Sequence, residues 1–227
     1  MAPAREGPSA AEALGRHSIG MRIACLAVRH QHKDNMARGY SLIDVLFATT
    51  ILVIVTAMAV PIVVYSAEYS RASAAARYLA ARIAVVRMDA VKRSAYVALR
   101  FESQNGQYRF RAYVDGNDNG IRSTDIAQKV DAALGPADQL ENHFSGVTFG
   151  LYDDVLPVTA EEALVDGDPI RLGRSDLLSF SPLGSASSGT LYIRGAGKQQ
   201  RAVRVLGVTG RVSILRFDFQ NRRWTAP

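Results

Sequence analysis

The most prominent pattern along the chain is an apolar stretch in its first third. Residues 45–64 carry no charge, and only Thr49, Thr50, Thr56 and Pro61 interrupt the apolar run. Roughly 20 such residues in a helix cross a hydrocarbon layer ~30 Å thick. A helix buried in a soluble core rarely reaches this length without a polar face, so the stretch predicts a membrane span.

A helical period follows the apolar stretch. Small and apolar residues recur at steps of three and four, the spacing of one helix face; they are Ala75, Leu79, Ile83, Val86 and Ala90. No Gly or Pro occurs in residues 62–95, so local propensity favours helix throughout. We expect one helix of about fifty residues whose second half packs on a globular domain. Because the polar positions are basic, a helix lying on a membrane surface or on nucleic acid is the alternative.

After residue 95 the period falls to two, which indicates β-strands. Apolar and polar residues alternate on both sides of Asn105-Gly106, a dipeptide typical of a two-residue hairpin turn. Further strands are expected at 147–152, 177–180, 190–194, 202–208 and 211–219. The acidic, turn-rich residues 116–176 are expected to form long loops. The predicted fold class is α+β, a long N-terminal helix packed on an antiparallel sheet domain.

Composition and charge agree with a membrane-held, exported chain. Apolar residues make up 48% of the sequence and charged residues 21%. The mean hydropathy, near zero, is higher than expected for a plain soluble domain with this charge, which indicates that the apolar residues are concentrated in one region. Residues 1–39 hold six basic and three acidic residues, and this positive excess before the apolar stretch predicts a cytoplasmic N-terminus. The one cysteine, Cys25, also lies there, so no disulfide is expected in the remainder.

A short motif separates this basic segment from the apolar stretch. It reads Arg38-Gly39-Tyr40-Ser41-Leu42-Ile43-Asp44-Val45-Leu46. It resembles the class III signal of type IV prepilins and pseudopilins, and an ordinary secretory signal has its cut site after the apolar centre instead. The resemblance implies that a membrane aspartyl peptidase, the prepilin peptidase, cuts after Gly39 and methylates Tyr40. Initiation at Met21 or Met36 would shorten the leader.

The same resemblance assigns roles in assembly to Asp44 and Pro61. Asp44 falls where the family has Glu, and in the family this acid pairs with the terminal amine of a neighbouring subunit. A carboxylate in an apolar helix is costly and normally marks a function, and the helix N-terminus favours an anion. Pro61 falls where pilins place a proline that bends the helix. A stray acid at the membrane interface is the alternative for Asp44.

The C-terminal half resembles minor pseudopilins of the GspH/FimT type. The resemblance rests on Leu178-Ser179-Phe180-Ser181-Pro182-Leu183-Gly184, on Gly210-Arg211-Val212 and on the Asp115-Gly116-Asn117-Asp118-Asn119-Gly120 loop. It implies a removed leader at 1–39, a transmembrane and assembly helix at 40–65, its amphipathic continuation at 66–95 and a β-rich head at 96–227. The expected partners are the prepilin peptidase, other pilins or pseudopilins, the inner-membrane assembly platform and the inner membrane itself.

Motifs for catalysis or cofactors are weak in this sequence. The Asp115–Gly120 loop has oxygen side chains at positions 1, 3 and 5 of a calcium loop, but position 12 is Ile126. Turns capped by Asp and Asn side chains explain the same residues. His143 is the one histidine after the cut and has no serine nucleophile beside it in the sequence. We therefore expect no enzyme, no cofactor and no metal site.

Charge is divided unevenly over the second half. Residues 102–176 hold fourteen acids and six bases, whereas residues 194–227 hold eight bases and one acid. A basic segment of this kind can bind DNA, and the candidate residues are Arg211, Arg216, Arg222, Arg223 and Trp224. A solvated strand face or a contact with acidic loops of a neighbour is the alternative.

These observations lead to one leading function and two alternatives. The leading function is a structural subunit of a type II secretion pseudopilus or a type IV pilus. The second is a DNA-binding minor pilin for uptake, and the third is a signal-anchored exported enzyme.

Overall fold

The computed structural model of the chain describes residues 40–159, 167–173 and 175–226. The chain divides into two units, Met1–Leu46 and Phe47–Pro227. The helices are α1 (Leu42–Arg93), α2 (Ser123–Ala127) and α3 (Leu140–His143). The strands are β1 (Val97–Gln104), β2 (Gln107–Val114), β3 (Ala132–Asp138), β4 (Thr148–Phe149), β5 (Ile170–Arg171), β6 (Leu177–Phe180), β7 (Gly189–Gly195), β8 (Gln199–Leu206), β9 (Arg211–Asp218) and β10 (Arg223–Thr225).

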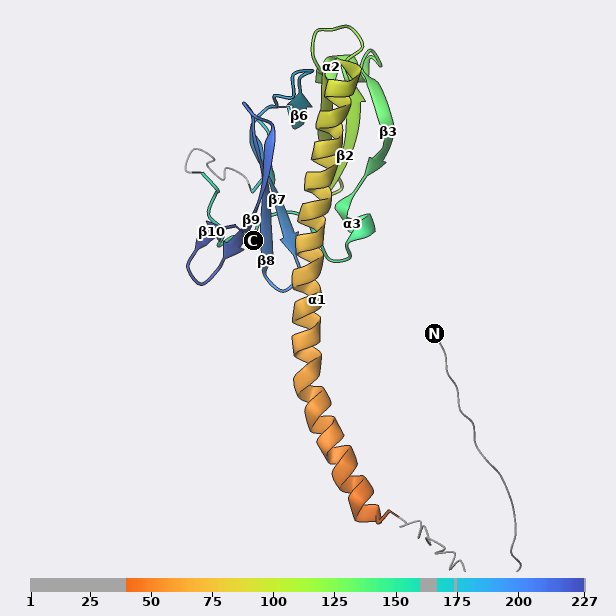
Figure 1. Cartoon of the computed structure of the whole chain (residues 1–227), viewed down its shortest axis with the longest axis vertical. Coiled ribbons are helices and arrows are strands. Elements are labelled where there is room, and N and C mark those ends of the chain that lie inside the picture. The colour runs from red at the N-terminus through yellow and green to blue at the C-terminus, as the bar shows by residue number, and fades with distance from the viewer. Residues whose placement is uncertain (1–39, 160–166, 174, 227) are drawn as a thin grey trace, which may run out of the picture. The chain divides into compact units, whose positions relative to one another are not determined.

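The second half of α1 packs against the β-strands along one face. All five residues of the expected apolar period are buried in this face, together with two further alanines, Ala72 and Ala76. Figure 1 shows this half of α1 beside strands of both sheets. The alanines let the helix approach closely, and a fully buried Leu79 contributes roughly 2–3 kcal/mol. The predicted helix and its packed face are therefore confirmed.

The strands form two antiparallel sheets. The first has the order β3-β2-β1-β6, and the second has the order β10-β9-β8-β7-β4, with β5 also pairing to β7. The predicted hairpin is confirmed: β1 and β2 pair from Val97↔Val114 to Gln104↔Gln107. The turn between them has φ +54° at Asn105 and +78° at Gly106, which is the left-handed pair that a type I′ turn requires.

One hydrophobic core joins α1 to both sheets. Leu99 and Phe110 enter it from the first sheet, and Leu191 and Val203 enter it from the second. Phe149 of β4 is in edge contact with Phe101, Tyr108 and Phe110, so this short strand closes the core between the sheets. The predicted α+β class, a long helix on antiparallel strands, is confirmed.

The segment 116–176, expected to form long loops, contains more structure than that. It holds two short helices and the strands β3, β4 and β5 among its described residues. The strand expected at 147–152 is reduced to Thr148–Phe149, and Gly150 makes one further bond, to the Tyr192 carbonyl. The strand expected at 202–208 begins earlier, at Gln199, and ends at Leu206. A turn at 207–210 follows, and it leaves Val208 93% exposed.

Candidate assembly helix and basic C-terminal segment

The first turn of α1 is capped by the side chain of Asp44 and by backbone hydrogen bonds to Ser41. The Ser41 backbone N–H donates to Asp44 Oδ2 at 3.2 Å, and the Ser41 carbonyl accepts from the Asp44 and Val45 N–H groups. This is one half of a capping box, with Ser41 at the N-cap and an acid three residues later. Asp44 thus lies where the helix N-terminus stabilises an anion. Tyr40 is 88% exposed, and Gly39 lies outside the described residues.

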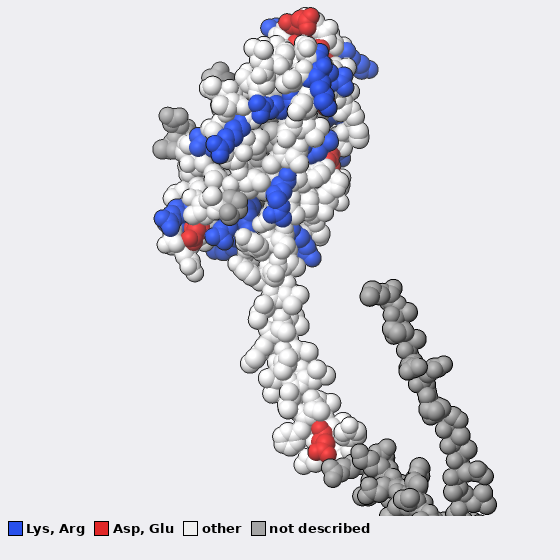
Figure 2. Space-filling model, in the orientation of Figure 1, with Lys and Arg blue, Asp and Glu red and all other residues white. Residues whose placement is uncertain are grey.

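The apolar stretch of α1 is exposed along its length. Every residue in 47–65 is solvent-accessible, and at ~1.5 Å per residue this stretch is ~28 Å long. Figure 2 shows it without charged side chains in the orientation drawn. Among the described residues, α1 is the one helix long and apolar enough to cross a membrane. Because isolated apolar surface of this size is unfavourable in water, the stretch requires an apolar environment.

Pro61 lies inside α1 without breaking the helix. It has no N–H, so the carbonyl four residues earlier loses its helical donor. One turn before Pro61, the Thr56 hydroxyl donates to the Leu52 and Val53 carbonyls at 2.8 and 3.0 Å. Hydroxyl bonds of this type often accompany helix bending. Both residues therefore favour a bend in the apolar stretch.

Polar contacts fix the second half of α1 to the strands. The Tyr78 hydroxyl donates to Asp138 Oδ2, and His143 Nε2 lies 2.8 Å from Asp138 Oδ1. Burial is the largest influence on the Asp138 carboxyl and by itself would raise its pKa. The bonds from Tyr78 and His143, with one from the Gln139 N–H, outweigh burial and hold this pKa below its ordinary value. Burial and the neighbouring carboxylate raise the pKa of Tyr78.

Two motifs that carry the GspH/FimT resemblance meet on one arginine of α1. Arg87 Nε donates to the Gly184 carbonyl at 2.9 Å. Gly210 comes close to the same guanidinium: a Cβ at Gly210 would lie 2.6 Å from the Gly184 oxygen and 2.9 Å from Arg87 Nε. A glycine is required at 210 for this reason and because its φ is +59°. These motif residues therefore position the helix against the second sheet.

The five basic-segment candidates do not form a single surface. Arg211 lines a groove beside Arg87 and Met88, whereas Arg216 lines a different groove beside Tyr65 and Tyr69. The two arginines are five residues apart on β9, so their side chains leave opposite faces of the strand. Arg222 is exposed in the turn before β10, and Arg223 lies opposite Asp218.

Trp224 is held within the head. Its Nε1 donates to the Leu156 carbonyl at 2.8 Å, and its ring packs against Phe217 and Tyr192 at centroid distances of 5.1 and 5.7 Å. A ring committed to these contacts is not free to stack on a base. DNA binding by this segment stays a prediction, and the geometry offers it no common face.

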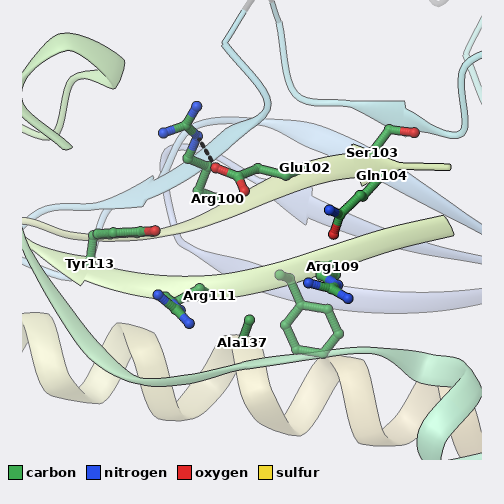
Figure 3. A pocket seen from close by; sticks show the side chains of 9 residues that line it. Arg100, Glu102, Ser103, Gln104, Arg109, Arg111, Tyr113 and Ala137 are labelled. Carbon is green, nitrogen blue, oxygen red and sulfur yellow. Dashed lines mark ion pairs between the residues drawn. The ribbon is translucent and has the colours of Figure 1, made fainter. Parts of the chain in front are cut away.

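The outer face of β1 and β2 carries a second collection of charges. A hollow of about 360 Å³ lies on this face, and Arg100 Nε pairs there with Glu102 Oε1 at 3.0 Å. Figure 3 shows the side chains that line it. Arg109 is in register with Glu102, and Arg111 is in register with Arg100. Like charges directly opposite each other are unfavourable, and exposed ion pairs contribute at most about 1 kcal/mol. This face is a solvated charged surface with a small positive excess.

The Asp115–Gly120 loop is organised by its own carboxylates. Asp115 accepts from the Asn117 and Gly120 N–H groups at 3.1 and 2.6 Å, and buried Asp131 accepts from the Gly116 and Arg122 N–H groups. These are the capped turns named as the alternative to calcium binding. Across the described ranges, no group of three or more His, Cys, Asp or Glu side chains is placed to hold a metal ion.

Sequence reasoning missed four residues that connect the helix to the rest of the head. Tyr78 and His143 are 65 positions apart, and Arg201 and Ser73 are 128 apart. Arg201 belongs to the basic segment 194–227, for which a solvated strand face was one interpretation, yet its side chain is only 1% exposed. The sequence offered two signals for the first of these contacts: a tyrosine on the polar side of the helix and the one histidine of the head.

The family model described as type II transport protein GspH matches residues 75–209. A search of solved structures gives the minor pseudopilin EpsH from the type 2 secretion system of Vibrio cholerae. The match has 14% identity and a TM-score of 0.39, and covers 63% of this chain and 94% of that one. No curated protein sequence matches the chain.

Proposed function

The chain belongs to the family of type II transport protein GspH, and on that premise we propose that it is a minor pseudopilin, a structural subunit of a type II secretion pseudopilus. The observation that carries this proposal is the exposed apolar stretch at 47–65, which continues in the same helix into a face buried against two sheets. Such a helix attaches a folded head to a membrane first and to neighbouring helices afterwards.

Processing is the first step of this proposal. The prepilin peptidase cuts after Gly39 and methylates the new N-terminus at Tyr40. Residues 1–39 are then the leader, 40–65 the transmembrane and assembly helix, 66–95 its amphipathic continuation and 96–227 the β-rich head. The basic leader keeps the N-terminus in the cytoplasm, so the head faces the periplasm from the inner membrane.

Assembly is the second step, and Asp44 has the central role in it. Before assembly its carboxylate accepts the Ser41 N–H in the first turn of α1. We propose that in the fibre this carboxylate pairs with the methylated amine of a neighbouring subunit, which sets the axial register. A pair of opposite charges between apolar helices is well defined because residues 45–64 of α1 offer no competing charge. Pro61 bends the helix so that the apolar stretches can pack.

Photo-crosslinking in cells tests this assembly. A photo-crosslinking amino acid replaces Val53, which is 65% exposed in the apolar stretch, and a matched variant carries it at Asn105 in the exposed hairpin turn. We expect position 53 to crosslink to other pseudopilins and position 105 to do so far less. Gly39→Ala, which blocks the cut, should abolish the crosslink from position 53. A crosslink that is independent of Gly39, or absent at position 53, contradicts the proposal.

A further inference from the structure

A polar groove lies where the apolar stretch of α1 reaches the second sheet. It encloses about 470 Å³, and its lining includes Tyr65 and Tyr69 of α1, Lys198 of the β7–β8 turn and Arg216 of β9. Tyr65 directly follows Val64, the last residue of the uncharged stretch. Figure 2 shows Lys and Arg side chains at the end of the head from which that stretch emerges. The groove therefore lies at the boundary between apolar helix and polar head.

A buried arginine lies against the groove wall. Arg201 is 1% exposed, and its guanidinium stacks 4.8 Å from the centre of the Tyr69 ring. Its NH groups donate to the Ser73 hydroxyl and the Gln200 carbonyl at 3.0 and 3.1 Å. No carboxylate in the described part of the chain forms an ion pair with it. Burial is the main influence that lowers its pKa, and its positive charge remains uncompensated.

Arg216 adds a second positive charge near Arg201. It is the register partner of Arg201 across β8 and β9, so two guanidinium groups adjoin each other on neighbouring strands. Arg216 Nε is buried and has no hydrogen-bond partner. Two adjacent arginines and an unsatisfied donor are unfavourable unless an anion binds between or beside them.

Three acids lie at or beside the groove, and one of them, Asp218, lines it. Hydrogen bonds from Asn221 and, after them, the nearby positive charge of Arg216 lower the pKa of Asp218. The Asp218 carboxylate accepts from the Gln220 and Asn221 backbone N–H groups and from Asn221 Nδ2, which fixes it in the turn after β9. Glu68 lies against Gly197, and Asp154 is 3.5 Å from Lys198 in an exposed pair that exchanges readily with solvent. On the side of Arg216, the charges of Arg201 and Arg77 outnumber that of Asp218, so this side of the groove keeps a positive character.

We propose that this groove binds the phosphodiester of an anionic phospholipid headgroup, such as phosphatidylglycerol. The inference rests on the proposed membrane function, because the groove reaches headgroup level only when the uncharged stretch 45–64 spans the bilayer. Guanidinium groups bind phosphate oxygens in pairs, and tyrosines favour the interface for their amphipathic rings. A carboxylate of a partner protein would suit the same charges, but the position beside a membrane-length stretch favours the lipid.

The experiment uses the full chain in lipid nanodiscs that contain phosphatidylcholine and phosphatidylglycerol in equal amounts. Native mass spectrometry measures the ratio of the two lipids that stay bound to the ejected chain. Each basic residue at an anionic surface contributes about a fivefold preference, so Arg216→Gln and Lys198→Gln should each lower the ratio by about that factor. Lys198 is exposed, so its variant tests the groove even if Arg216→Gln fails to fold.

Arg211→Gln is the matched control. It removes the same charge from the same strand, but five residues away, roughly 17 Å along β9 or about two Debye lengths. We expect it to leave the lipid ratio within about twofold of the unmodified chain. A second control distinguishes a soluble phosphate ligand from a lipid headgroup: glycerol phosphate is added to nanodiscs of pure phosphatidylcholine. We expect the chain not to bind glycerol phosphate.

Several outcomes would overturn the proposal. If the unmodified chain retains both lipids equally, the headgroup site is excluded. The proposed membrane function is not contradicted by that result as long as the chain still inserts into the nanodisc. If Arg211→Gln lowers the lipid ratio as much as Arg216→Gln does, the preference comes from general attraction to the anionic surface and not from binding in the groove. Binding of glycerol phosphate reassigns the groove to a soluble anion. A chain that does not stay in the nanodisc contradicts the proposed function itself.

Discussion

Asp138→Asn is the substitution that most directly tests how α1 is held against the strands. The Asp138 carboxylate accepts three hydrogen bonds, from the Tyr78 hydroxyl of α1, from His143 Nε2 and from the Gln139 N–H. Asparagine has nearly the same shape but keeps one oxygen, so at least one charge-assisted bond is lost. Such a bond contributes about 1.5–3 kcal/mol, and we expect a loss of about 2 kcal/mol at pH 7.

The assay is thermal unfolding of the full chain in detergent, followed by the fluorescence of Trp224, which is the single tryptophan and lies in the head. For a chain of this size about 2 kcal/mol corresponds to a Tm decrease of roughly 4–8 °C. Exposed Asp153→Asn removes the same charge elsewhere and should change Tm by no more than about 2 °C.

The effect of Asp138→Asn should depend on pH in a defined direction. The pKa of Asp138 is lowered in the folded chain, so its stabilisation is present above the ordinary carboxyl pKa and is lost as pH falls through the folded value. The Tm difference between the two chains is therefore largest at neutral pH and shrinks below about pH 4. A difference that is absent at pH 7, or unchanged from pH 7 to pH 3, refutes this explanation of the contact.

Three further predictions follow from single side chains. Leu79→Ala opens a cavity in the fully buried face of α1 and should lower the free energy of unfolding by about 2–5 kcal/mol, measured by the same fluorescence assay. Burial, and after it Asp168, raises the pKa of Tyr108 to about 12. The contribution of the protonated Tyr108 hydroxyl to folding stability is therefore present below pH 10 and is lost between pH 10 and 12. Tyr108→Phe should remove that part of the alkaline loss, and an identical alkaline profile contradicts the assignment. Asp44→Ala should be processed normally yet lose the crosslink from position 53, whereas Asp44→Glu keeps it; equal crosslinking by all three chains excludes a role for this acid in assembly.

Much of the fold was predictable because its strongest signals are local. The period of Leu79, Ile83 and Val86 indicated the packed helix face, and Asn105-Gly106 gave the position of the first hairpin turn. β3 was missed because its sequence, Ala-Ala-Leu-Gly-Pro-Ala-Asp, has no alternation and contains Gly and Pro, which are usual in loops and edge strands. β5 and β10 are too short to show a period.

The candidate site was predictable only in the part whose signals are local in the sequence. The motif around Gly39 and the apolar stretch are contiguous, so sequence alone indicated a processed membrane helix. Arg201 could not be recognised as buried, because its environment comes from Tyr69 and Ser73, far away in the sequence. Arg211 and Arg216 appeared to be one basic segment, and only the strand geometry shows that they face different grooves.

The mass of the mature N-terminal peptide tests the central claim most directly. The chain is co-expressed with a prepilin peptidase, and its N-terminal peptide is analysed by mass spectrometry, with Gly39→Ala as the control. We predict a peptide that begins at Tyr40 with a methylated amine in the unmodified chain, and an uncut leader in the variant. An intact junction between Gly39 and Tyr40 in the unmodified chain would contradict the assignment of this protein as a pseudopilin subunit.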